Sequence, residues 1–382
     1  MSSMTEVDIA IVGAGIGGMA AAISLHRAGF TVGVYEQAPR FGRVGAGINL
    51  TPNAVKVLDG LGVGAVLRGT AYEPTSRVSR LWDSGQETSR LELHAQGERR
   101  YGAPQLTIHR ADLLSALETA LPAGAVRLGA KVAGVGQDGR QAWLELADGS
   151  RVAARAVVGC DGIHSVVREA IAGPEAPRFT GKVAFRSIVP TAPLARYDLT
   201  PTTKWWGPDA SSQIFTFLID RGQRELFVFA TVPETEWTHE SWSIQGHKDE
   251  LLRAYAGFHE EALAILEGCD VVLKTALYAR DPMARWTHGR VTLLGDACHA
   301  MLPFMAQGAA MGLEDAAVLS RCLGQAKDDV PAALLRYEQA RLERASRIQR
   351  GSLQNDWLRS DTNADWVYGY DAWTEPLPER AH

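Results

Sequence analysis

Cysteine is scarce in this chain, and its few copies are too far apart to share a site. The four cysteines among the 382 residues stand at positions 160, 269, 298 and 322, without any Cys-x-x-Cys pair. Zinc sites and disulfide frameworks need closer and more regular spacings. The sequence therefore predicts no metal site and no disulfides, and reduced thiols of a cytoplasmic protein.

The chain also lacks a charge excess and a long apolar run. Its 39 Lys and Arg residues against 44 Asp and Glu give a net charge of -5, so neither nucleic acid nor an anionic membrane surface is an expected partner. The first apolar stretch, Ile9 to Ile23, follows acidic residues and is interrupted by glycines, unlike a signal peptide. No run of about 18 apolar residues occurs, so no membrane span is expected.

The N-terminus reads as a βαβ unit. A β-branched strand at Val7–Val12 is followed by a glycine-rich turn and a helix at Met19–Ala28, with Gly29 as its cap. A second strand at Thr31–Tyr35 ends at Glu36. Strand, helix and strand in this order are typical of an α/β fold with a parallel sheet.

The remaining chain divides into α/β-like and β-rich parts. Helices are expected at 53–61, 111–121, 309–323 and 331–353, and strands at 126–135, 142–146, 152–158 and 291–294. Between Phe185 and Val232 the alternation of apolar residues, as in 213–219 and 225–232, predicts an antiparallel sheet. The residues near Pro376 and Pro378 read as a loose tail.

A chain of this length is expected to form two packed units. The predicted fold class is a Rossmann-like α/β domain with an inserted, mostly antiparallel substrate domain and a C-terminal helical segment. The predicted boundaries are 1–72, 101–180 and 276–330 for the first domain, 73–100 and 181–275 for the substrate domain, and 331–382 for the C-terminal helix and tail.

The glycine-rich turn carries the first chemical motif. Gly13, Gly15 and Gly18 fit G-x-G-x-x-G, in which the first glycine permits the turn, the second admits a pyrophosphate and the third lets helix and strand pack closely. The helix that follows directs its free N–H groups at the phosphates. Glu36 stands where a carboxylate takes the hydroxyls of an adenosine ribose, which fits either NAD or FAD.

Two further motifs follow buried strands. Gly295-Asp296 comes directly after 291–294 and places a carboxylate at the carboxyl end of a strand, where open α/β sheets bind ligands. The helix that begins near Gly308 would direct its N-terminus at negative charge on a flavin ring. The third motif, Cys160-Asp161-Gly162, is only a turn signal on its own.

These motifs, in this order and at these separations, resemble the group A FAD-dependent aromatic monooxygenases, the family of 4-hydroxybenzoate and salicylate hydroxylases. The similarity runs through essentially the whole chain. It is greatest to members that hydroxylate hydroxypyridine carboxylates, through segments at 45–48, 108–110, 204–206, 305–309 and 366–371.

The resemblance implies FAD as cofactor, NADH or NADPH and O2 as co-substrates, and hydroxylation of an aromatic or N-heteroaromatic ring through a flavin hydroperoxide. It assigns the AMP half of FAD to the glycine motif and Glu36, ribose or pyrophosphate to Arg43 and Arg110, and the ribityl chain to Asp296. Asp161 would belong to a motif linked with both nucleotides. The full set of predicted cofactor-binding residues is Gly13, Gly15, Ile16, Gly18, Glu36, Arg43, Gly47, Arg110, Val132, Asp161, Asp296, Pro303, Gly308 and Ala309.

The substrate residues depart from the resembled hydroxylases. Asn49 and Phe304 stand where histidines are expected, and 211–217 contains neither His nor Tyr. The substrate-pocket candidates are therefore Asn49, Gln213 and Phe304 near the reaction, and Arg186, Thr216, Phe217, Phe229 and Met305 around the substrate. Core packing is an equal alternative for Phe217 and Phe229, and a structural role is at least equal for Arg186. His299 is a weaker candidate base.

Three alternatives stay open at this stage. A larger neutral substrate would suit Asn49 and Phe304, a nicotinamide-dependent dehydrogenase without flavin would need only the first motif, and an FAD-binding protein could be non-catalytic. The expected partners are a small aromatic substrate, O2 and NAD(P)H, and the protein is expected to be a monomer or homodimer. The sequence leaves open the ring, any coupled decarboxylation and the choice between NADH and NADPH.

Overall fold

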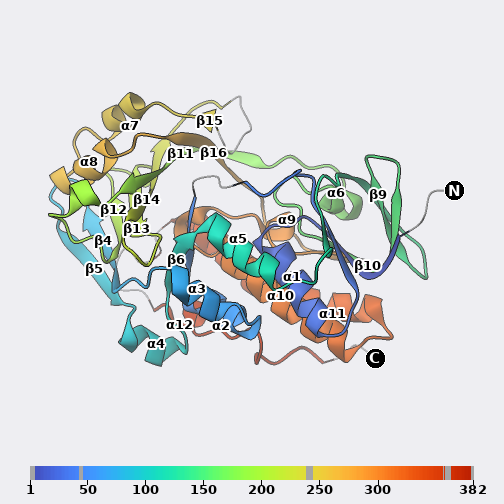
Figure 1. Cartoon of the computed structure of the whole chain (residues 1–382). Helices are drawn as coiled ribbons and strands as arrows, with labels where there is room; N and C mark the ends of the chain where they lie inside the picture. Colours follow the sequence, from blue (N-terminus) through green and yellow to red (C-terminus); the bar gives the residue numbers. More distant parts are fainter. Residues whose placement is uncertain (1–4, 43–45, 238–243, 356, 358–362, 380–382) are drawn as a thin grey trace.

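The computed structural model describes residues 5–42, 46–237, 244–355, 357 and 363–379. Two sheets of eight strands each and a small two-stranded sheet account for the strands within these ranges. Long helices run side by side across the first sheet, and the second sheet lies at the other end of the molecule (Figure 1). The α/β fold class predicted from the sequence is confirmed.

The N-terminal βαβ unit forms as predicted from β1 (Thr5–Val12), α1 (Ile16–Arg27) and β2 (Val32–Tyr35). β1 pairs in parallel with β2 on one side and β10 on the other. Its central residues Ile9 and Ile11 are completely buried because the strand is covered on both faces. The alanines of α1 let this helix lie close to its neighbours.

The first sheet has the order β17-β18-β10-β1-β2-β7, with β9 paired to β10 and β8 to β9. β10 and β18 run parallel to β1. Their carboxyl ends therefore meet at one edge, which brings all three sequence motifs together. The strands beyond the N-terminal unit are β7 (Val126–Arg127), β8 (Val132–Gln137), β9 (Ala142–Leu146), β10 (Arg151–Gly159), β17 (Thr287–His288) and β18 (Val291–Leu293).

The prediction of a single strand at 126–135 is wrong. β7 ends at Arg127, and Gly129 adopts a φ of +67°, which turns the chain away. β7 then adds to β2 in parallel, whereas β8 pairs with β9 in the antiparallel sense. An apolar run interrupted by one glycine is therefore two strands with different partners.

The helical layer is built around α10. It packs against α1, α2 and α11 (Figure 1). A Cβ on Gly312 would lie 3.5 Å from the Cα of Gly17, so α10 and α1 approach almost backbone to backbone. The helices of this part are α2 (Pro52–Gly60), α3 (Gly64–Thr70), α4 (Ala95–Tyr101), α5 (Arg110–Thr119), α6 (Val166–Ala172), α9 (Asp296–His299), α10 (Gly308–Gln325), α11 (Val330–Gln354) and α12 (Asp365–Tyr368).

The second sheet has the order β15-β16-β11-β14-β13-β12-β4-β5 and is antiparallel except for the β12–β4 pair. Its strands are β4 (Ser76–Leu81), β5 (Glu87–Glu92), β11 (Arg178–Pro190), β12 (Thr202–Trp206), β13 (Gln213–Leu218), β14 (Glu225–Pro233), β15 (Ile244–Gln245) and β16 (Leu273–Ala279). The antiparallel character predicted for 185–232 is found here. The exact domain boundaries given from the sequence stay a prediction.

The two faces of the second sheet have different partners. One face, with Ile214, Leu226 and Val228, packs against α7 (Lys248–Ala254) and α8 (Glu260–Glu267). The opposite face carries a row formed by Arg186, Phe229, Phe215 and Lys204, which are paired across β11, β14, β13 and β12. Because side chains alternate along a strand, this row points away from α7 and α8. It faces the loop Leu302–Phe304, which packs with Phe229.

The small sheet of β3 (Gly47–Leu50) and β6 (Leu106–His109) lies against this inner face. A Cβ on Gly47 would lie 2.6 Å from the Phe227 ring and 2.8 Å from the Phe217 ring. Only glycine therefore allows β3 to reach the second sheet. Arg110 follows β6 directly and opens α5.

The expected loose tail is also wrong for the residues described there. Tyr368 and Ala372 are completely buried. Arg321 donates to the carbonyls of Ala372 and Glu375, and Arg336 donates to Pro378. Prolines remove backbone donors but leave carbonyls that arginines can hold, so this segment is fixed to α10 and α11. No helix in the described ranges has the length and apolarity to cross a bilayer.

Candidate active site

The glycine turn between β1 and α1 has the geometry of a phosphate-binding loop. Gly13 has a φ of +96°, and a Cβ there would lie 2.5 Å from the Cys160 carbonyl oxygen. A Cβ on Gly18 would lie 2.0 Å from the Gly13 carbonyl oxygen. At Gly15, in contrast, a Cβ would meet nothing within 4 Å. The first and third glycines are thus required by the fold, while the second borders open space through which a pyrophosphate can approach the N-terminus of α1.

Glu36 lies beside this turn at the end of β2. One carboxylate oxygen accepts from the Ala14 amide at 2.8 Å, and the other accepts from the Ala38 amide at 2.8 Å. These contacts hold the carboxylate next to the glycine loop, where the motif places a ribose. Ile16, the first residue of α1, is buried beneath the loop.

Asp296 occupies the edge formed by β18. Gly295, with a φ of +68°, turns the chain, and Asp296 is the one exposed residue within the otherwise buried run from Val291 to Ala300. Although the side chain has solvent-accessible surface, the protein atoms packed around it desolvate the carboxyl and raise its pKa, while His299 and Arg110 oppose this rise. A Cβ on Gly308 would lie 3.9 Å from Asp296 Oδ1. The N-terminus of the 18-residue helix α10 therefore opens beside this carboxylate.

Arg110 interacts with both Asp296 and Glu36. Desolvation lowers the pKa of its guanidinium, and the carboxylates of Asp296 and Glu36 oppose this fall. Both carboxylates therefore act on the same cation. A cleft with a glycine loop, a ribose carboxylate, a second carboxylate and a cation fits the phosphates, the ribose and the ribityl hydroxyls of FAD.

Asp161 has a different role in the geometry. Ser165 Oγ donates to one carboxylate oxygen, and the amides of Val166 and Val167 donate to the other at 2.8 and 3.2 Å. The side chain thus caps the start of α6. Both carboxylate oxygens already accept hydrogen bonds from residues of this chain. The predicted link of Asp161 to the nucleotides stays a prediction.

The other predicted cofactor residues lie around the same cleft or outside the described residues. Val132 opens β8, two residues after Ala130, whose amide donates to the Glu36 carbonyl at 2.8 Å. Pro303 precedes α10 and is exposed, and Ala309 lies in its first turn. Arg43 lies outside the described residues.

A buried network of ion pairs includes His299, the last residue of the short helix that Asp296 opens. His299 Nε2 lies 2.6 Å from Asp315 Oδ2, and Arg341 pairs with Asp315 and Glu314 at 2.8 Å each. Arg344 pairs with Glu314 at 2.8 Å. His299, considered as a base from the sequence, is therefore held inside the protein by Asp315. The network fastens α11 to α10 and to the turn that carries Asp296.

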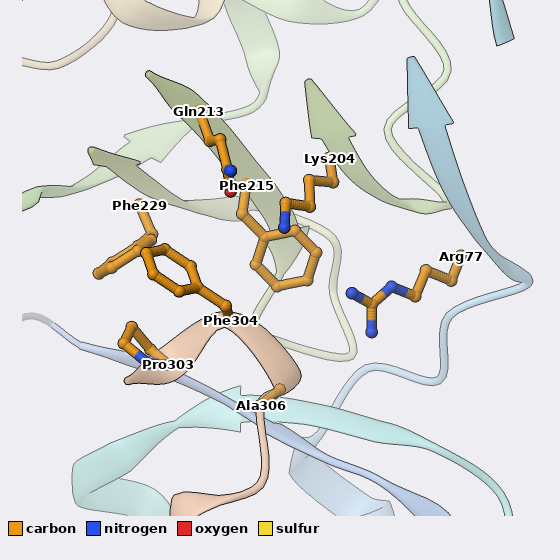
Figure 2. A pocket seen from close by; sticks show the side chains of 8 residues that line it. All are labelled: Arg77, Lys204, Gln213, Phe215, Phe229, Pro303, Phe304 and Ala306. Atoms are coloured by element: carbon orange, nitrogen blue, oxygen red, sulfur yellow. The ribbon is translucent and has the colours of Figure 1, made fainter. Parts of the chain in front are cut away.

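A pocket lies between the second sheet and the segment before α10, with about 330 Å³ of empty space that includes its opening to solvent. Aromatic side chains from β13, β14 and this segment surround it, and two cationic side chains lie toward β4 and β12 (Figure 2). The lining residues are Arg77, Lys204, Gln213, Phe215, Phe229, Pro303, Phe304 and Ala306. The set contains no histidine, cysteine, tyrosine or carboxylate.

The structure brings only some of the predicted substrate residues to this pocket. Gln213, Phe229 and Phe304 line it. Arg186 is on the same sheet face, in register with Phe229. Asn49 is buried, and neither its Nδ2 nor its Oδ1 has a hydrogen-bond partner.

Three other candidates point elsewhere. Thr216 alternates with Phe215 along β13 and so projects to the face covered by α7 and α8. Phe217 packs against Phe227 and beneath Gly47. Met305 is buried in the main core, where a Cβ on Gly351 would lie 3.0 Å from its sulfur. The alternation of side chains along β13 and the short helix Pro303–Met305 determine where these three side chains point.

Sequence reasoning missed Arg77, Lys204, Phe215 and Ala306. For two of them a signal exists: alternation from Gln213 places Phe215 on the same face, and Lys204 is a charged residue in the buried strand Thr202–Trp206. Arg77 gives no local signal, because β4 reaches the pocket only through its parallel pairing with β12. Ala306 has a φ of +55°, a conformation that its residue type does not predict.

The chain matches the family described as FAD binding domain over residues 6–352. It is 43% identical to 6-hydroxynicotinate 3-monooxygenase of Bordetella bronchiseptica over 97% of each chain. It is 37% identical to a 3-amino-4-hydroxybenzoate 2-monooxygenase of Streptomyces platensis, covering 95% of this chain and 96% of the relative. A solved salicylate hydroxylase in complex with substrate superimposes with a TM-score of 0.82 at 27% identity, over 96% of each chain.

The protein belongs to this FAD-binding family. The predictions of FAD as cofactor and of an FAD-dependent aromatic monooxygenase are confirmed. The open space at Gly15 and the exposed Asp296 agree with that cofactor. The alternative of a dehydrogenase without flavin is excluded by the same findings.

Proposed function

We propose that the protein hydroxylates a single aromatic or N-heteroaromatic ring that carries a hydroxyl and a carboxylate, with FAD, O2 and NADH or NADPH. The observation that carries the proposal is the continuity of the two sites. Pro303, Phe304 and Ala306 line the aromatic pocket, and Gly308 beside Asp296 opens the cofactor helix two residues later. A ring in this pocket lies next to the cofactor cleft.

The walls of the pocket support an aromatic substrate. Phe215, Phe229 and Phe304 offer ring faces and edges for stacking. A planar ring would contact all three side chains through stacked or edge-on packing.

Bound FAD, reduced by the nicotinamide nucleotide, supplies the activation of oxygen. The chain then has to hold and orient the ring beside the cofactor. Gln213 donates through Nε2 to the Ala210 carbonyl at 2.9 Å, while its Oε1 is buried without a partner. This oxygen can accept a hydrogen bond from a ring hydroxyl or ring N–H.

None of the lining residues is an ordinary general base. The ring hydroxyl therefore has to ionise readily or pass its proton to water, and the cationic side of the pocket favours the anionic form. Hydroxypyridine and aminohydroxybenzoate acids, which the names of the relatives give as their substrates, suit this requirement. The monomer or homodimer state and a cytoplasmic location stay predictions.

The test is NAD(P)H oxidation by the FAD-loaded protein against hydroxybenzoates, hydroxypyridines and pyridine carboxylates, with products analysed by mass spectrometry. We expect one or a few acids to accelerate oxidation and to gain one oxygen atom. Acceleration without an oxygenated product would identify a non-substrate effector. If no compound is oxygenated, the single-ring proposal is wrong.

A further inference from the structure

We propose that Arg77 and Lys204 form the recognition site for the carboxylate of the substrate. The inference rests on the proposed function and names the residues that select an acid over a neutral ring. Both residues carry cationic side chains and line the pocket from the neighbouring strands β4 and β12.

Arg77 is a buried cation at the wall of the pocket. It is only 3% exposed, yet Nε and Nη1 are buried without any hydrogen-bond partner. Its guanidinium carbon lies 5.6 Å from the centroid of the Phe215 ring. A buried charged group with unmade hydrogen bonds is costly, and a carboxylate in the pocket would supply an acceptor for one of these donors together with a charge partner for the guanidinium.

Lys204 places a second positive charge at the same side of the pocket. Its Nζ donates to Asn355 Oδ1 at 3.2 Å and lies 3.6 Å from the centre of the Trp206 ring. Asn355 in turn donates to the Ala210 carbonyl at 2.8 Å. The amino group is thus fixed by an amide and an aromatic face at the wall of the pocket.

The arrangement orients the substrate. Figure 2 shows the Arg77 guanidinium and the Lys204 ammonium extending into the pocket from β4 and β12, with Pro303 and Phe229 on the opposite side. An acid held by the two cations would point its ring toward Phe229 and Phe304. The edge opposite the carboxylate would then lie nearest the segment that leads into α10.

The experiment compares matched acids and amides. FAD-loaded wild type, Arg77→Met and Lys204→Met are titrated with 6-hydroxynicotinate, 6-hydroxynicotinamide, 4-hydroxybenzoate and 4-hydroxybenzamide, and binding is followed by flavin absorbance. We expect wild type to prefer the better-bound acid over its amide. Arg77→Met should lose about 10- to 100-fold in affinity for that acid, as expected for a hydrogen bond to a charged group, with amide binding changed by less than about 3-fold.

The control variant is Arg90→Met on the adjacent strand β5. Arg90 is paired with Glu87 at 2.7 Å and does not line the pocket, so its loss should leave the acid preference intact. FAD content and the unfolding midpoint exclude misfolding. Equal binding of acid and amide by wild type, or equal losses for both in Arg77→Met, would overturn the carboxylate site.

Product analysis of the same compounds distinguishes a failure of the carboxylate-site proposal from a failure of the proposed function. If wild type oxygenates phenols and amides as well as acids, the carboxylate assignment is wrong while the monooxygenase reaction stands. If wild type oxygenates no ring at all, the proposed function is wrong. The acid preference in the binding titration still decides whether Arg77 and Lys204 bind a carboxylate in that case.

Discussion

Two buried arginines show how differently the cofactor side and the substrate side are built. Arg341 is fully buried between two carboxylates, with Glu314 and Asp315 each 2.8 Å away. Arg77 is 3% exposed, and two of its nitrogens have no partner. The same residue type is neutralised by the chain in one place and left in need of acceptors in the other.

Charged side chains that are paired within the protein stabilise the fold, whereas a buried charged side chain with unpartnered donors can bind a ligand. The ion network around Arg341 joins α10, α11 and the turn that carries Asp296, so the cofactor cleft is held before any ligand arrives. In the pocket, Arg77 and Gln213 retain buried polar atoms without hydrogen-bond partners. A polar aromatic substrate would supply partners for these atoms.

The largest effect should follow from breaking the structural arginine. Arg341→Met leaves Glu314 and Asp315 buried without the cation that they share, so we expect the free energy of unfolding to fall by about 3–5 kcal/mol. Denaturant unfolding of the protein measures this loss, and FAD retention should fall with it. A change below about 1 kcal/mol would contradict the structural role of the network.

The same network predicts a pH dependence. Its positive partners His299 and Arg341 outweigh desolvation and hold the pKa of Asp315 below its usual value. A carboxyl whose pKa is lower in the folded state stabilises the protein above its unfolded pKa. We therefore expect this contribution to be lost in acid, and Asp315→Asn to flatten the acid limb of the stability profile.

Two glycines of the phosphate loop offer a matched pair. Gly18→Ala would put a Cβ 2.0 Å from the Gly13 carbonyl oxygen. We therefore expect the free energy of unfolding to fall by about 1–3 kcal/mol, and FAD binding to weaken as well. Gly15→Ala meets no protein atom within 4 Å, so the apoprotein should keep its stability while FAD binding weakens. Unfolding of the apoproteins and FAD titration distinguish the two, and equal effects would contradict this reading of the loop.

Asp296→Asn should act in opposite directions on stability and binding. Because desolvation raises the pKa of Asp296 in the folded state, its ionised carboxyl costs folding free energy at neutral pH, a cost that disappears as the pH falls below the unfolded pKa. We expect the apoprotein variant to be slightly more stable at neutral pH and to bind FAD about 10-fold more weakly. Tighter FAD binding would show that the carboxylate does not hold the cofactor.

The smallest stability effect should be at Arg77. Replacing an unpaired buried cation by an apolar side chain removes a desolvation cost, so Arg77→Met should change the unfolding free energy by less than about 1 kcal/mol, or raise it. Thermal unfolding without substrate measures this change, and the same measurement on Arg341→Met gives the comparison. A loss of several kcal/mol would mean that Arg77 is a structural residue like Arg341.

The cofactor half could be predicted from the sequence because its chemistry is local. Gly13, Gly15 and Gly18 meet requirements set by a turn of a few residues, and Asp296 directly follows the strand that positions it. The network behind these residues was not predictable, because Arg341 reaches Asp315 from a different helix. The loose tail was predicted wrongly because arginines far away in the sequence hold its carbonyls.

The sequence by itself determined the N-terminal βαβ unit, which depends on residues adjacent in the chain, and its three motifs with the family they resemble determined the cofactor and the class of enzyme. Only the tertiary structure decided which side chains meet the substrate. Pairing of β4 with β12 brought Arg77 to Lys204, strand parity turned Thr216 away, and the turn at Ala306 joined the pocket to the cofactor helix. The physical reason is that the pocket forms where strands from distant parts of the sequence pack together. A short segment of sequence does not determine which strands it will pair with.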